Sequence, residues 1–315
     1  MNPEKFISLE VPRGTKAAVD LEVGDGLLLP VLVVRGAEAG KTLVVTAAVH
    51  GDEYEGVRAI FEVNEELDPA QMKGDLLAVP AANPPAFWNG TRSSPLDDGN
   101  LARVFPGAPN GSPTERIAYW LGKAILSRAD FYLDLHSGGV KWQMPAMVGF
   151  HAHDQRAREA AGIFGANVVW AHPSVPPGRT VSFATDRGIP WLYTEMRGGG
   201  RIHSEDLLLC KNGIRNLMGH LEILPTKPPQ ARIEWRLLGD GNIDLGLAPS
   251  RRGFFIADVA LLERVRKGQS LGRLLDLHGK VMESYAAPRD GVVALVRQFP
   301  VVEPGEPLLL ITEEE

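Results

Sequence analysis

Cysteine is almost absent from the sequence. Cys210 is the only one in 315 residues, so a disulfide framework within the chain is excluded. This usage fits a reducing compartment, and we expect a cytoplasmic protein. No apolar run reaches the length of about 18 residues that a membrane span requires. The N-terminal segment also lacks the long apolar core of a signal peptide.

The sequence has no excess of positive charge. It contains 33 Lys and Arg residues against 39 Asp and Glu residues, which gives a formal net charge of −6. Binding to nucleic acid or to an anionic membrane by bulk electrostatics needs the opposite balance. We therefore expect neither as a partner, while a local basic pocket and a homo-oligomer stay open.

Two common active-site signatures are also missing. The motif H-E-x-x-H, which places two zinc ligands on one helix, does not occur. Residues 35–42 (RGAEAGKT) resemble a phosphate-binding loop, but only three residues separate Gly36 from the Gly-Lys pair, where that loop has four. A strand-like run follows, where the loop requires a helix. The sequence therefore argues against a helix-borne metalloprotease site and a phosphate-binding loop.

Strand and helix patterns alternate over residues 40–224, which predicts an α/β sheet covered by helices on both faces. Ligands of such sheets bind beyond the carboxyl ends of the strands. The predicted strands are residues 27–34, 42–49, 76–80, 131–135, 167–170 and 191–194. The predicted helices are residues 53–67, 114–129 and 154–165 and a helix that begins at Ser204.

Two other stretches have a different character. Residues 83–113 are rich in Pro, Gly, Asn and Ser without a clear period, and such long loops are usually functional or disordered. The segment TKPPQ at 226–230 is typical of a linker, and short strands with turn residues follow it. We predict a catalytic domain over residues 1–225. We predict a small all-β domain over residues 226–315, which resembles a barrel-sandwich or lipoyl-like module without a carrier lysine.

A candidate metal site follows the strand at 42–49. His50 and Glu53, three residues apart, converge on one ion if the chain turns sharply, and Gly51 permits that turn. A catalytic zinc needs three protein ligands and one open position, and two His and one Glu form a known set. His136 is the best third candidate, because its strand reaches the same edge of the sheet.

Each of these residues alone has an ordinary structural explanation. A single histidine is more often a core or surface residue than a ligand, and six of the eight histidines lack any comparable context. Asp134 lies two residues before His136 and on the same side of the strand. It could orient a ligand, and a buried structural carboxylate is an equal alternative.

Several motifs together resemble the succinylglutamate desuccinylase/aspartoacylase family, which is related to the zinc carboxypeptidases. They occur in order over about residues 42–200. The resemblance implies a zinc-carboxypeptidase-like mixed sheet flanked by helices, with a smaller C-terminal β domain. The motifs are TAAVHGDEYEG, ANPPAFWNGTR, DDGNLARVFPG, LDLHSGG and TEMRGGG.

The resemblance also implies roles for particular residues. One Zn²⁺ per chain would be held by His50, Glu53 and His136. Glu195 would be the general base, and Arg92 would polarise the scissile carbonyl group. An Asn-Arg pair that grips a substrate carboxylate matches only in part.

In that pair, Arg103 aligns with the Arg, but Ala102 stands where the family has Asn. Asn100 comes two residues before Ala102, so its side chain is not expected to take the place of the family Asn. The usual carboxylate clamp is therefore in doubt, and the amine portion of the substrate need not be a standard α-amino acid. N-acetylated diamino acids, which related chains deacylate, are the first substrates to test.

The implied activity is removal of the N-acyl group from an N-acylated amino acid or diamino acid by metal-activated water. Two alternatives remain open at this point. A metallocarboxypeptidase acting on short peptides would need an open groove. A metal-dependent binding protein without catalysis would have no need of Glu195 as a base.

Overall fold

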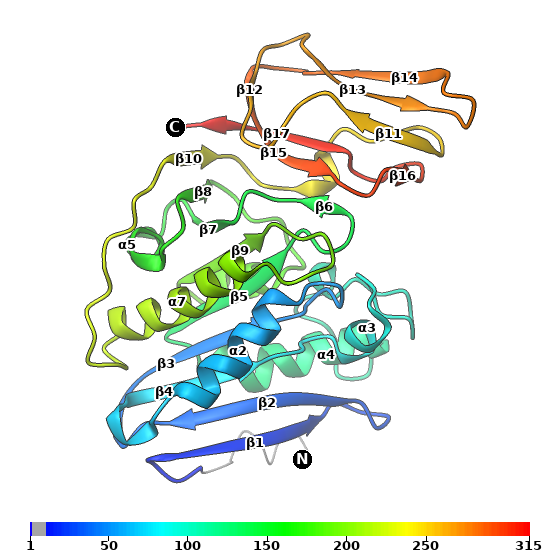
Figure 1. Cartoon of the computed structure of the whole chain (residues 1–315). Helices are drawn as coiled ribbons and strands as arrows, with labels where there is room; N and C mark the ends of the chain where they lie inside the picture. The colour runs from blue at the N-terminus through cyan, green and yellow to red at the C-terminus, as the bar shows by residue number, and fades with distance from the viewer. Residues whose placement is uncertain (2–10) are drawn as a thin grey trace.

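The computed structural model describes residue 1 and residues 11–315. A mixed sheet of 13 strands runs through the molecule in the order β1-β2-β4-β3-β5-β9-β7-β8-β10-β17-β15-β12, with β6 paired to β15. Its first eight strands in that order are β1 (Thr15–Glu22), β2 (Leu28–Arg35), β4 (Lys73–Val79), β3 (Glu38–Ala47), β5 (Phe131–Ser137), β9 (Trp191–Met196), β7 (Met147–His151) and β8 (Val168–His172). Figure 1 shows the β1–β2 hairpin at one end of the molecule and the C-terminal strands at the other.

The centre of the sheet is parallel. β4, β3, β5 and β9 pair in parallel in that order, so β3, β5 and β9 end at the same edge. Such strands are buried on both faces and carry continuous apolar runs. β3 shows this in the alternation of its buried side chains between two hydrophobic clusters, since Leu43 and Val45 belong to one and Val44 to the other.

Helices cover both faces, as the sequence predicts. The cluster that contains Val45 also holds side chains of α2 (Glu55–Glu66), α5 (Gln155–Phe164) and α7 (Ser204–His220). The other cluster holds side chains of α4 (Pro113–Trp120) and α6 (Thr180–Thr185). Figure 1 shows α2 and α7 side by side on the first face.

The helices differ from the sequence prediction in three details. The helix expected over residues 114–129 ends as α4 at Trp120, and a π turn (Leu121–Ile125) and a 3₁₀ turn (Leu126–Arg128) follow it. The stretch 83–113 contains α3 (Pro84–Asn89), which Asn83 caps through the backbone N–H of Ala86. α6 was not predicted. α3 and α6 have six residues each, too few to show a helical period.

The sheet continues into the C-terminal part of the chain. β10 (Trp235–Leu238) pairs in parallel with β8 and antiparallel with β17 (Leu309–Glu314), which in turn pairs with β15 (Gly291–Arg297). A second, antiparallel sheet has the order β14-β13-β11-β16. The mixed α/β fold with a C-terminal antiparallel sheet is thus confirmed, while the division of domains at residues 225 and 226 stays a prediction.

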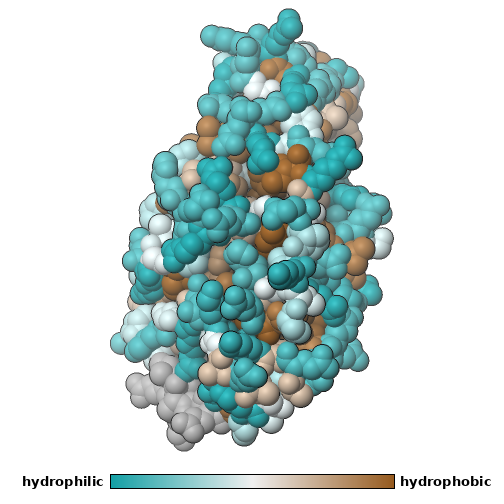
Figure 2. Space-filling view, turned by 90° about the vertical axis from the view of Figure 1, so that its left-hand side faces the viewer, coloured by the Kyte–Doolittle hydropathy of each residue, from teal (hydrophilic) through white to brown (hydrophobic). Residues whose placement is uncertain are grey.

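The remaining strands are short. They are β6 (Trp142–Gln143), β11 (Gly253–Ala257), β12 (Arg264–Val265), β13 (Ser270–Leu275), β14 (Val281–Ala286) and β16 (Val301–Val302). On the face drawn in Figure 2, hydrophobic residues form small areas separated by hydrophilic ones. Among the described residues, none of the helices combines the length and the apolar character needed to cross a membrane.

Candidate metal centre and active site

His50 and Glu53 lie in the turn between β3 and α2. Ala48 adopts a positive φ of 49° there, so the sharp change of direction occurs before His50. Gly51 is needed for a different reason than the sequence indicates. A Cβ atom on Gly51 would lie 2.0 Å from the carbonyl carbon of Ala86, so this turn packs directly against the backbone of α3.

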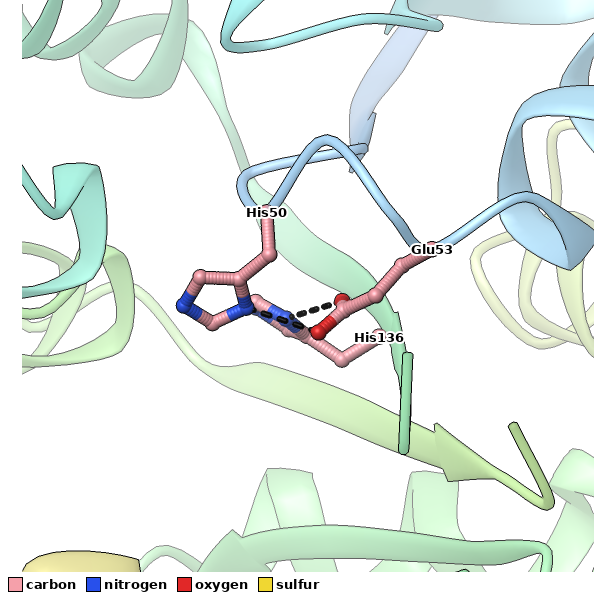
Figure 3. Close-up of side chains that lie close together, drawn as sticks. All are labelled: His50, Glu53 and His136. Carbon is pink, nitrogen blue, oxygen red and sulfur yellow. Dashed lines mark hydrogen bonds and ion pairs between the residues drawn. The ribbon is translucent and has the colours of Figure 1, made fainter. Parts of the chain in front are cut away.

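His50, Glu53 and His136 converge. The Glu53 carboxylate faces both imidazoles, with 2.7 Å from Oε1 to Nδ1 of His50 and 2.8 Å from Oε2 to Nδ1 of His136 (Figure 3). One ligand atom from each residue lies within 4.8 Å of the others. All three side chains are shielded from solvent, with exposed fractions of 5%, 3% and 10% in that order. The structure therefore brings together the three residues that the sequence proposes.

Asp134 holds the His136 ring from its other side. Its Oδ2 lies 3.1 Å from Nε2 of His136, and its carboxylate also accepts hydrogen bonds from the hydroxyls of Thr46 and Thr180. The Nε2 proton of His136 therefore points at Asp134, which leaves Nδ1 to face Glu53 and the candidate metal position. This geometry favours the orienting role over that of an unrelated buried carboxylate.

The donor set fits a divalent metal ion. Nδ1 of His136 faces a carboxylate oxygen of Glu53 at 2.8 Å, so a positive charge, carried by a second ring proton or by a metal ion, has to lie between them. Burial, and then the charge of Arg92, lowers the pKa of His50 to about 4, so its imidazole is neutral and able to bind a metal at pH 7. Nε2 of His50 is buried without a hydrogen-bond partner. Imidazole and carboxylate together suit zinc, and also other transition metals.

The same electrostatics holds Glu53 ionised. Burial would raise its pKa, but His50 and His136 lower it below the ordinary value. For His136 the effects are reversed. Burial would lower its pKa, but the carboxylates of Asp134 and Glu53 raise it well above the ordinary value. Both shifts show that the site attracts positive charge, which a proton or a metal ion can supply.

Asp134→Asn should weaken metal binding. Asn keeps the size of the side chain but loses the charge that fixes the Nε2 proton of His136, and loss of such a partner costs roughly 10- to 100-fold in metal affinity. A competition titration with a chromophoric chelator measures the effect. Asp206→Asn is the matched control, because Asp206 is equally buried but bonds Arg197. Equal affinities for Asp134→Asn and wild type would contradict the orienting role.

Glu195 lies on β9, directly opposite His136 on β5. Its side chain lines a pocket that also contains His50, His136 and Arg92. Burial, and then the negative charge of Glu53, raises the pKa of Glu195 to about 8. A cation bound at Glu53 would offset that charge and favour the ionised carboxylate that a base requires.

Arg92 also faces the metal centre. Its Nη1 lies 3.5 Å from Oε1 of Glu53, and its guanidinium carbon lies 5.1 Å from the centre of the Trp142 ring. The ring stacking and the ion pair hold a positive charge at the rim of the candidate metal site. Arg92 therefore places a guanidinium group beside the three candidate metal ligands.

The proposed carboxylate clamp looks different from the sequence expectation. Arg103 lines the pocket, but its guanidinium forms a fork with the carboxylate of Asp244, with distances of 3.1 and 3.2 Å. Asn100 does not appear among the residues that line this pocket. Its side chain caps the 3₁₀ turn Leu101–Arg103 by accepting a hydrogen bond from the backbone N–H of Ala102. Asn100 thus supports the turn that carries Arg103.

Sequence reasoning missed one wall of the pocket. His172, which has no motif around it, is buried there beside Arg179 and Tyr193. Tyr193 could have been found, because it precedes Glu195 by two residues and so points to the same side of β9. Asp240 could not have been found, because it lies in the C-terminal part of the chain, far in sequence from the motifs of the site.

Comparisons with known proteins agree with this geometry. The family of the succinylglutamate desuccinylase/aspartoacylase catalytic domain matches residues 39–221. An N-alpha-acetyl-L-2,4-diaminobutyric acid deacetylase from Halomonas elongata is 33% identical over 299 residues, covering 91% of this chain and 86% of that protein.

Solved structures show the same fold over nearly the whole chain. A succinylglutamate desuccinylase from Silicibacter sp. TM1040 aligns with a TM-score of 0.86 and 28% identity, covering 97% of each chain. The product-bound ectoine utilization protein EutE (DoeB) from Ruegeria pomeroyi aligns with a TM-score of 0.85 and 28% identity, covering 97% of this chain and 98% of that one.

Proposed function

The chain belongs to the succinylglutamate desuccinylase/aspartoacylase family, and we propose that it is a zinc-dependent hydrolase that removes the acyl group from an N-acylated amino acid or diamino acid. One observation carries the proposal. His50 and His136, which converge with Glu53, line the same pocket as the carboxylate of Glu195 and the guanidinium group of Arg92. The names of the similar proteins, a deacetylase and a desuccinylase, support the same reaction type.

His50, Glu53 and His136 would hold the zinc ion. The chemistry that zinc supplies in such a site is Lewis acidity, which lowers the pKa of a water molecule to about 7. The Glu195 carboxylate accepts the proton of the attacking water and passes it to the leaving amine nitrogen. The Arg92 guanidinium donates hydrogen bonds to the carbonyl oxygen as it gains negative charge.

Arg103 is the proposed ligand of a substrate carboxylate, supported by the turn that Asn100 caps. A guanidinium binds a carboxylate as a two-pronged fork. Asp244 occupies that fork in this structure, so a substrate carboxylate has to compete with it or bind at its side.

The shape of the pocket favours a small substrate over a peptide. Residues of the C-terminal part of the chain, among them Asp240, Ile243 and Leu310, line the same pocket as the metal-ligand set. They add a wall to the pocket, whereas a carboxypeptidase would need an open groove. This enclosure supports the deacylase over the metallocarboxypeptidase.

Amine release from a panel of N-acyl amino acids, N-acyl diamino acids and dipeptides tests the proposal. We expect release from N-acyl substrates that stops when a chelator removes the metal and returns when zinc is added. Release from dipeptides alone would favour the carboxypeptidase. A protein that holds its metal and hydrolyses no member of the panel would contradict the proposed activity.

A further inference from the structure

A chain of hydrogen bonds crosses the pocket wall that lies apart from the metal-ligand set. Nδ1 of His172 lies 2.7 Å from the carbonyl oxygen of Gly239, and Nε2 of His172 lies 2.9 Å from the hydroxyl of Tyr193. A carbonyl oxygen can only accept a hydrogen bond, so Nδ1 must carry the imidazole proton. Burial lowers the pKa of His172 to about 4, so the ring is neutral and Nε2 has a lone pair.

The direction of the second bond follows from the first. Because Nε2 of His172 is an acceptor, the hydroxyl of Tyr193 must donate its only proton to it. The Tyr193 oxygen then has only lone pairs left for any other partner. Tyr193 lines the pocket beside Glu195, so it offers a ligand an acceptor and no donor.

Charged side chains around Tyr193 extend this pattern. Asp240 lines the same pocket, and its Oδ1 accepts a hydrogen bond from the backbone N–H of Asn242. Arg179 donates from Nη2 to the side-chain oxygen of Asn242, at 3.0 Å. Arg103, paired with Asp244, also lines the pocket, as Arg92 does on the side of the metal-ligand set.

Charges of both signs therefore stand side by side on this wall. A ligand with one carboxylate and one ammonium group complements such a wall better than a ligand with several carboxylates, which would meet Asp240 and the lone pairs of Tyr193. An N-acylated diamino acid has this pair of charges, because its acylated nitrogen is neutral and its second amine is protonated.

We propose that His172 fixes Tyr193 as a hydrogen-bond acceptor and that Tyr193 and Asp240 form the subsite for the free ammonium group of a diamino substrate. This inference rests on the proposed deacylase function. Arg103 and Arg179 bind the carboxylate of the same substrate. Tyr193 and Asp240 are thus specificity residues that distinguish a diamino acid from an amino acid with an apolar or acidic side chain.

A pair of substrates that differ only in the ammonium group tests the subsite. Nα-acetyl-2,4-diaminobutyrate and Nα-acetyl-2-aminobutyrate have the same backbone, and the second lacks the terminal amine. We expect wild type to prefer the first in kcat/KM. Tyr193→Phe should reduce that preference roughly 10- to 100-fold, mainly through a higher KM for the diamino substrate, because a hydrogen bond to a charged group is lost.

Two further variants separate recognition from general damage. His172→Phe keeps an aromatic ring in the wall but removes the acceptor, so the Tyr193 hydroxyl can donate into the pocket and the preference should fall although Tyr193 is present. Tyr285→Phe is the matched control, because Tyr285 lies on β14 and bonds Glu283. The Tyr285→Phe variant should show the same preference for the diamino substrate as wild type.

Calorimetric binding of 2,4-diaminobutyrate and 2-aminobutyrate gives a readout without turnover. We expect wild type to bind the diamine more tightly, and Tyr193→Phe to lose that difference. Equal binding of the two amines by wild type, or equal losses on both substrates in Tyr193→Phe, would overturn the subsite. If other N-acyl substrates are still hydrolysed, only this inference fails. If none is hydrolysed by metal-loaded protein, the proposed function fails instead.

Discussion

Glu195→Gln should lower kcat by roughly 10²- to 10⁴-fold, the range that loss of a general base produces. Gln keeps the size and hydrogen-bonding capacity of the side chain but cannot accept a proton from water. Glu195 lines the pocket and pairs across the sheet with His136, so its carboxylate is already placed beside the metal-ligand set. Steady-state amine release, measured alongside metal content, gives the result.

The zinc content of Glu195→Gln shows whether a loss of activity comes from the missing base or from a missing metal ion. Glu195 is proposed as a base and not as a ligand, so Glu195→Gln should hold as much zinc as wild type. Glu205→Gln is a suitable control, because the Glu205 side chain is 75% exposed and pairs with Arg197. Hydrolysis by Glu195→Gln at the wild-type rate would remove the proposed mechanism and favour a binding protein without catalysis.

Glu53→Ala should abolish both metal binding and activity. Its carboxylate faces both imidazoles and is the only negatively charged member of the proposed ligand set. Without this carboxylate, only the two imidazoles of His50 and His136 remain as ligands. Two neutral ligands bind zinc far more weakly than three ligands of which one is negatively charged. Elemental analysis after dialysis against a weak chelator measures the loss.

A second variant guards against misfolding. Glu53→Gln retains the volume of the side chain and hydrogen-bonding groups toward the imidazoles, while it removes the charge. We expect it to fold with a near-normal thermal transition and still to lose most of its zinc. Full metal content in either variant would show that the ligand assignment is wrong.

The edge of the sheet that carries the site could be predicted from the sequence. His50, His136 and Glu195 follow or end apolar strands, and parallel strands bring their carboxyl ends together. The structure confirms that β3, β5 and β9 are neighbours in this order. The positions of the three residues therefore follow from local patterns and one general rule of sheet topology.

Features that depend on distant contacts could not be predicted in this way. The sequence aligns Arg103 with a carboxylate ligand, but no local signal shows that Asp244, 141 residues later, would occupy its fork. The role of Gly51 depends likewise on the approach of α3, and the pattern suggested conformational freedom instead. No motif surrounds His172, because its hydrogen bonds are made with Gly239 and Tyr193, which lie on other segments of the chain.

Reconstitution of metal-free protein with zinc tests whether the deacylase activity depends on the metal. The protein is stripped with a chelator, zinc is added in steps, and amine release from an N-acetyl diamino acid is followed together with bound metal. We expect activity to rise with bound zinc and to reach its maximum at one ion per chain. Full activity in the metal-free protein, or zinc bound at this site without any release from N-acyl substrates, would contradict this expectation.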